Sequence, residues 1–115
     1  MKESQVVTSL LKLLKQHGFF WKASDRYYAG IPDIIGCYCG RFVAIEVKID
    51  SNKPTPLQTH YIEKIREAGG FAEVVTYVNL KRIYRIQNTE TTRQGVIECI
   101  LRRIVLNTNS NVLRK

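Results

Sequence analysis

The stretch IPDIIGCYCGRFVAIEVK, residues 31–48, decides the fold prediction. Residue types that are enriched in strands, namely Ile, Val, Phe and Tyr, stand on both sides of Cys39-Gly40. These two residues are the natural turn between two strands, and Pro32 fits the start of the first one because it cannot donate to a ladder. Residues 33–38 and 41–49 are therefore predicted to form an antiparallel hairpin, whose apolar pattern is interrupted by acids and a lysine.

A two-residue turn fixes the register of this hairpin. It pairs Tyr38 with Arg41 and, counting outward, places Asp33 opposite Glu46. Like charges directly opposite each other destabilise a strand pair, so a positive charge is expected beside them. Alternation puts Lys48 on the same face as Glu46. A four-residue loop keeps this pairing, whereas an odd loop without a compensating bulge would place the two acids on opposite faces.

Paired acids beside a lysine indicate a chemistry. Two close carboxylates with room for water are the ligands that a hard divalent cation, Mg²⁺ or Mn²⁺, prefers. Such an ion stabilises charge on a phosphoryl oxygen, and Lys48 can orient the nucleophile. Each residue taken singly has an ordinary explanation. Asp33 would be an acid in a turn, and Glu46 and Lys48 would be charged residues on a solvent-exposed strand face. Taken together, the three favour metal-dependent hydrolysis of a phosphodiester.

The composition favours a polyanionic partner. The 115 residues carry 18 Lys and Arg against 10 Asp and Glu, a net charge of +8, and 44% of them are hydrophobic, enough for one domain with one core. Nucleic acid and an anionic membrane surface both match this charge, but no apolar run approaches the ~18 residues of a membrane span. Without a secretory signal at the N-terminus, we expect an intracellular protein with no membrane partner. The odd number of cysteines, three, favours reduced structural thiols.

Helical spacing recurs before and after the hairpin. An amphipathic helix is predicted over Glu3 to Gln16, followed by a strand over Phe19 to Ser24. Thr55-Pro56-Leu57-Gln58 predicts the start of a second helix, with an N-cap, a proline at the first position and a capping-box glutamine. Its predicted buried face comprises Leu57, Tyr61, Ile62 and Ile65.

The remaining segments complete a fold class. Residues 71–78 are predicted to form another strand, residues 80–86 a short helix and residues 97–105 a strongly amphipathic helix, before a polar tail over residues 107–115. The expected architecture is α/β or α+β, a sheet with helices against it.

Several stretches together resemble a known family. They are an early helix that begins at Glu3, then GIPDIIG, FVAIEVK and PTPLQTHYIEKIREAGG, followed by a hydrophobic strand. Over residues 3–78 this combination resembles the stand-alone VRR-NUC (virus-type replication-repair nuclease) domain of the PD-(D/E)xK nuclease superfamily. The resemblance implies a restriction-endonuclease-like core, a mixed sheet with a central antiparallel hairpin. Residues 79–106 are then a helical extension.

The resemblance also implies roles for individual residues. Asp33 and Glu46 would be metal ligands, with the backbone carbonyl of Val47 as a further one, and Lys48 the catalytic lysine. Glu3 would be an accessory acid and Gln58 a site residue on the second helix. Both residues also have a structural explanation. Gln58 completes the capping box, and Glu3 is an acid at the positive end of a helix.

The implied activity is that of a metal-dependent DNA endonuclease. Small members of the superfamily resemble Holliday-junction resolvases, so a homodimer acting on branched DNA is expected. Cleavage of simple duplex ends or flaps, or a role in DNA repair, is compatible with the same interpretation. Arg26 and Lys53, in loops that flank the hairpin, are the expected phosphate contacts, and Tyr27 and Tyr28 are candidates for stacking on an unpaired base. The alternatives are a basic nucleic-acid-binding protein that keeps the fold without turnover and, more distantly, an RNA-binding protein.

Overall fold

The chain folds around one six-stranded mixed sheet. The structure is a computed structural model that describes residues 1–23 and 29–113, with side chains described to residue 106. The sheet order is β1-β2-β3-β4-β5-β6, and only the β3–β4 pair is parallel. In chain order the elements are α1 (Glu3–Leu14), β1 (Phe19–Lys22), β2 (Ile34–Tyr38), β3 (Arg41–Ile49), α2 (Pro56–Glu67), β4 (Phe71–Val78), β5 (Ile83–Ile86), β6 (Thr89–Thr91) and α3 (Arg93–Leu113).

The β2–β3 hairpin has the register that a two-residue turn predicts. Tyr38 pairs with Arg41, and Ile34 pairs with Ile45 at the far end of β2. Both turn residues have positive φ, 52° at Cys39 and 74° at Gly40, as a type I′ turn requires. The turn therefore keeps its geometry although its first position is a cysteine.

The α2 helix makes the parallel pairing of β3 and β4 possible. Parallel neighbours need a crossover connection, and α2 supplies it between Ile49 and Phe71. Thr55 is the N-cap of α2: its hydroxyl accepts a hydrogen bond from the Gln58 amide, and the Gln58 side chain accepts one from the Thr55 amide. The predicted start of this helix is confirmed.

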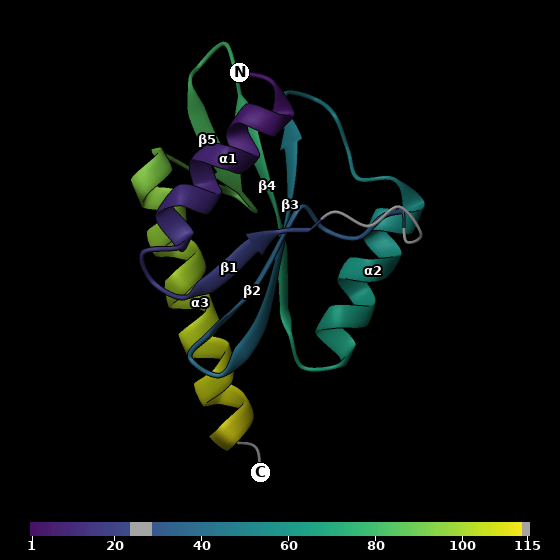
Figure 1. Cartoon of the computed structure of the whole chain (residues 1–115), viewed down its shortest axis with the longest axis vertical. Helices are drawn as coiled ribbons and strands as arrows, with labels where there is room; N and C mark the ends of the chain where they lie inside the picture. The colour runs from purple at the N-terminus through teal and green to yellow at the C-terminus, as the bar shows by residue number, and fades with distance from the viewer. Residues whose placement is uncertain (24–28, 114–115) are drawn as a thin grey trace.

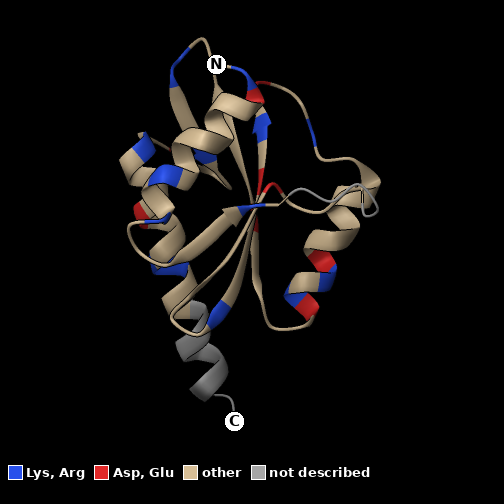
Figure 2. Ribbon diagram, viewed as in Figure 1, with Lys and Arg blue, Asp and Glu red and all other residues tan. Residues whose placement is uncertain are grey.

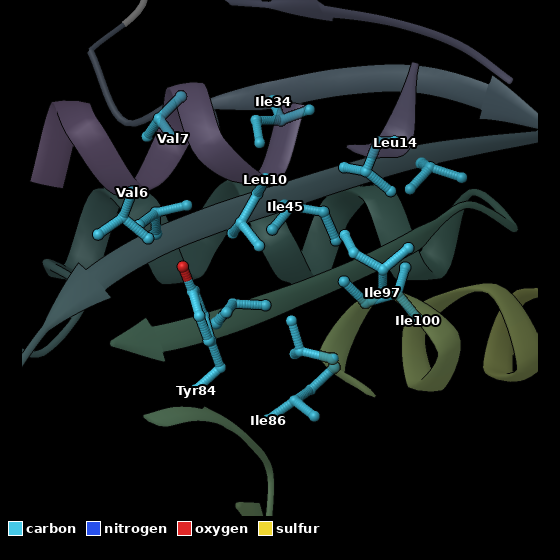
Figure 3. Packing of buried hydrophobic residues seen from close by; sticks show 14 of the residues in the cluster. Val6, Val7, Leu10, Leu14, Ile34, Ile45, Tyr84, Ile86, Ile97 and Ile100 are labelled. Atoms are coloured by element: carbon cyan, nitrogen blue, oxygen red, sulfur yellow. The ribbon is translucent and has the colours of Figure 1, made fainter. Parts of the chain in front are cut away.

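Helices cover both faces of the sheet. Figure 1 shows α1 and α3 on one side and α2 on the other. The larger core lies under α1 and α3, where β3 contributes Val43, Ile45 and Val47 (Figure 3). On the α2 side the core is small and consists of Ala44, Ile62 and Ala72, with Ile65 and Val74 packed against it. The prediction that Leu57 is buried is wrong, because its side chain is 46% exposed.

The C-terminal third differs from the prediction. The expected short helix over residues 80–86 is instead a turn followed by β5, in which Tyr84 and Ile86 are buried and alternate with half-buried residues. β5 pairs with β4 and with β6. Helix α3 begins at Arg93 and ends at Leu113, so most of the expected polar tail is helical. Among the described residues, none of the helices combines the length and the apolar character needed to cross a bilayer.

Candidate metal centre

Three carboxylates meet where β2 begins. One oxygen from each of Glu3, Asp33 and Glu46 lies within 4.8 Å of the others. In Figure 2 the acidic segments at the start of α1, before β2 and in β3 gather at the upper end of the hairpin. The residues come from three separate elements, so the cluster exists only in the folded chain.

Asp33 is held in place by the backbone of the neighbouring strand. It immediately precedes β2, and its Oδ2 accepts a hydrogen bond of 2.8 Å from the Val47 amide. Its own carbonyl accepts a hydrogen bond of 2.9 Å from Ala23, just after β1. Partial burial raises the pKa of Asp33, while the Val47 amide and the charges of Lys48 and Lys22 act in the opposite direction. The carboxylate is therefore fixed but poorly solvated.

Glu46 is the most deeply buried acid of the cluster. It is 1% exposed, and within the described part of the chain neither of its carboxylate oxygens has a hydrogen-bond partner. Burial and the neighbouring charge of Asp33 raise its pKa to about 8. A buried carboxylate that makes no hydrogen bond of good geometry and has Lys48 as its close positive charge remains costly, so this position is explained poorly by the stability of the protein alone.

Lys48 supplies the nearest positive charge. It follows Glu46 by two residues on the same face of β3, and its Nζ lies 3.3 Å from Glu46 Oε2. Lys48 is itself 8% exposed. The predicted arrangement of Asp33, Glu46 and Lys48 on one side of the hairpin is therefore present in the fold.

Glu3 reaches the cluster from the first turn of α1. The buried face of this helix packs on the sheet and fixes where its N-terminus lies. Burial raises the pKa of Glu3, Lys48 lowers it and Asp33 raises it. Glu3 thus lies beside the other two acids as well as at the favourable position of an acid at a helix N-terminus.

The loop before Asp33 packs against the start of α2. Gly30 has a φ of 93°, and a Cβ atom on it would lie 2.8 Å from Cγ of Leu57 and 3.2 Å from the amide nitrogen of Gln58. A glycine is needed here for both reasons. The contact brings the N-terminal turn of α2 beside the segment that carries Asp33, although the Gln58 side chain is engaged in the capping box.

The donor set fits a hard divalent cation. Carboxylate oxygens are the ligands that Mg²⁺ and Mn²⁺ prefer, and three of them converge here. The buried oxygens of Glu46 provide a second, independent indication: among the described residues they accept no hydrogen bond and have only the Lys48 ion pair, and a bound cation would offset their burial. Asp33 and Glu46 would be the principal ligands, with Glu3 within reach.

Of the two expected phosphate contacts, only Lys53 lies among the described residues. Lys53 is exposed in the loop between β3 and α2. Arg26, Tyr27 and Tyr28 lie outside the described residues. Sequence reasoning missed Lys22, whose charge lowers the pKa of Asp33; its position one residue beyond an exposed tryptophan on β1 carried no recognisable signal.

Comparison with solved structures places this fold among nuclease-type folds. A VRR_NUC domain protein matches with a TM-score of 0.63 at 23% sequence identity, covering 92% of this chain and 90% of that chain. Hjc, a Holliday junction resolvase from the archaeal hyperthermophile Archaeoglobus fulgidus, matches with a TM-score of 0.54 at 21% identity, covering 82% of this chain and 75% of that chain. No protein-family model and no curated protein matches the sequence. The predicted VRR-NUC-like fold is confirmed.

Proposed function

We propose that the chain is a divalent-metal-dependent DNA endonuclease that hydrolyses phosphodiester bonds and selects branched DNA, as a Holliday-junction resolvase does. The observation that carries this proposal is the buried Glu46 carboxylate, which has no hydrogen-bond partner among the described residues and lies beside Asp33, Glu3 and Lys48. The likeness to a VRR_NUC protein and to a resolvase supports it.

Each residue of the acidic cluster, and Lys48 beside it, has its own proposed role in hydrolysis. Asp33 and Glu46 would hold the Mg²⁺ or Mn²⁺ ion, the carbonyl of Val47 would be a further ligand and Glu3 would be an accessory acid. When bound, the ion supplies Lewis-acid stabilisation of phosphate charge and activates the hydrolytic water. Lys48 orients that water and stabilises the negative charge that develops on the phosphate. The water oxygen forms a bond to phosphorus, the bond to the leaving oxygen breaks, and a proton ends on that oxygen.

The basic surface gathers the substrate. A net charge of +8 attracts a polyanion and accelerates encounter at low salt. Arg26 and Lys53 are proposed phosphate contacts, and Gln58 is a proposed site residue at the start of α2. A homodimer would present two metal centres to two strands of a junction, which suits a chain of this size working on DNA inside the cell.

The test is a cleavage assay on a labelled four-way junction with Mg²⁺, Mn²⁺ or a chelator. The proposal predicts cutting with either metal and none with the chelator. Asp33→Asn and Lys48→Met should each lower the cleavage rate at least about 100-fold while largely sparing DNA binding, since removal of one transition-state contact has an effect of this size. Glu67→Gln, an exposed acid of α2, is the matched control and should cut normally.

Two results would overturn the proposal. Binding that persists while neither metal supports cutting would favour a non-catalytic DNA-binding protein on a nuclease fold. Full turnover in the Asp33 or Lys48 variant would remove the assigned role from that residue.

A further inference from the structure

Two aromatic rings stand exposed on the edge strand β1. The side chains of Phe19 and Trp21 are 72% and 44% exposed, while Phe20 between them is buried. Their ring centroids lie 5.1 Å apart with the planes tilted by 49°. Because β1 alternates, both rings lie on the face of the sheet opposite the larger core, which is the α2 face.

This face is continuous with the acidic cluster. Trp21 pairs with Ile35, and Ile35 pairs with Ala44, so the three side chains form a row across the sheet. Glu46 lies two residues beyond Ala44 on the same face. Neighbouring strands are about 4.8 Å apart and residues rise about 3.3 Å along a strand, so Trp21 and Glu46 are separated by about 12 Å.

A DNA strand can span this separation in a few nucleotides. At about 3.4 Å per stacked nucleotide, 12 Å corresponds to about three nucleotides, and to fewer when the strand is stretched. Lys22 ends β1, and the next residue, Ala23, donates its backbone amide to the carbonyl of Asp33. A positive charge therefore lies at the end of β1 beside the segment that carries Asp33. A phosphate backbone that enters the cluster along this edge of the sheet would pass the end of β1, and its next bases would come within reach of the rings.

The chemistry of the surface favours bases over a second protein. Full aromatic side chains offer about 150–250 Å² each, so the two rings expose on the order of 250 Å². A stable protein interface covers roughly 800 Å² on each partner. Aromatic rings on strands are the usual platforms on which unpaired bases stack, and stacking tolerates any base.

We propose that Phe19 and Trp21 form a stacking platform for unpaired bases about two or three nucleotides from the phosphodiester that is cut. The inference rests on the proposed function and narrows its substrate class to DNA with unpaired nucleotides beside the cleavage point, such as flaps, splayed arms and opened junctions. A continuous duplex keeps its bases paired and cannot use the platform.

Trp21 is the only tryptophan of the chain, so its fluorescence reports on the platform directly. The experiment titrates the wild-type protein with a flap DNA and with a blunt duplex, in the presence of chelator so that no cutting occurs. The flap should quench the emission of Trp21 and the duplex should leave it nearly unchanged. Emission that stays constant at saturating flap DNA would overturn the proposal.

Variants separate stacking from other uses of this face. Phe19→Leu and Trp21→Leu should each weaken flap binding about fivefold or more, with duplex affinity changed less than twofold, because each stacked base contributes about 1–3 kcal/mol. Phe42→Leu is the matched control: Phe42 lies on the same face as Trp21 and is also 44% exposed, but it lines a pocket together with Lys64, Ile65 and Ala68 at the end of α2. It should bind the flap normally.

A second copy of the chain is the competing occupant. If sedimentation shows that Trp21→Leu and Phe42→Leu both convert a dimer to a monomer, or if flap and duplex affinity fall equally in Trp21→Leu, the platform assignment is wrong. Phe19 is so exposed that its replacement leaves folding intact, which keeps the test decisive if Trp21→Leu misfolds. Quenching in a protein that no metal activates would refute the nuclease proposal and leave the platform standing.

Discussion

Replacement of Glu46 by glutamine is expected to stabilise the metal-free protein at neutral pH. The carboxylate is buried, has no hydrogen-bond partner among the described residues and has a pKa of about 8 against an ordinary 4.5. An acid whose pKa is raised on folding favours the folded state fully below the unfolded pKa. That contribution is lost as the pH rises from about 4.5 toward 8, because the unfolded chain ionises first. Glutamine is neutral throughout, so the variant escapes this loss.

The magnitude follows from the size of the shift. Between pH 4.5 and pH 7, each pH unit lowers the free energy of unfolding of the wild type by about 1.4 kcal/mol. The total loss by pH 7 therefore has an upper limit of about 3 kcal/mol. Relaxation of the site reduces the expected gain of Glu46→Gln to about 1–2 kcal/mol at pH 7, with little difference from the wild type at pH 4.5. At about 4 °C per kcal/mol, the melting temperature of the variant should be about 4–8 °C higher.

Melting curves at pH 4.5 and pH 7, with chelator and with Mn²⁺, measure this effect. Metal should stabilise the wild type by about 2.7 kcal/mol at 100 times the Kd and should stabilise Glu46→Gln far less. Glu73→Gln is the control, since Glu73 is a buried acid whose carboxylate is satisfied by Arg66 and Gln87. If Glu46→Gln is less stable than the wild type by the same margin at both pH values, Glu46 is an ordinary ion-pair partner of Lys48 and the reasoning fails.

Four further substitutions test how the fold supports the site. Gly36→Ala should lower the free energy of unfolding by at least about 2 kcal/mol in urea denaturation, because its Cβ would lie 2.2 Å from the ring of Phe20; a loss below 0.5 kcal/mol would show that this packing is loose. Arg41→Leu should cost about 2–3 kcal/mol in the same assay, since its guanidinium donates to three backbone carbonyls; an unchanged midpoint would mean that water replaces these bonds. Thr55→Ala and Gln58→Ala both break the capping box and should cost about 1 kcal/mol each. A cleavage rate that falls further in Gln58→Ala than in Thr55→Ala supports a site role for Gln58, and equal rates would reduce it to a capping residue.

The hairpin that carries the site is the most predictable part of this fold. Its register follows from a two-residue turn, and the pairing of Ile35 with Ala44 agrees with the count outward from Cys39-Gly40. Once that register holds, the periodicity of two places Glu46 and Lys48 on one face without further information. The start of α2 was equally predictable, because Thr55 and Gln58 form the capping box locally.

Contacts between elements distant in the sequence determine the features that local sequence patterns did not predict. Residues 80–86 have apolar spacings compatible with a helix, but β4 offers an edge on which Tyr84 and Ile86 become buried in alternation. Leu57 fits a helical stripe, yet α2 covers a narrow part of the sheet and leaves it exposed. The platform proposed on β1 was hidden for the same reason, because only the finished sheet shows that Trp21 lies in one row with Ala44.

The most direct test of the central claim is to locate Mn²⁺ by anomalous diffraction in crystals of the wild-type protein. The account predicts an anomalous peak within bonding distance of carboxylate oxygens of both Asp33 and Glu46. A peak elsewhere in crystals soaked at high Mn²⁺, with the Glu46 carboxylate unchanged beside Lys48, would contradict it.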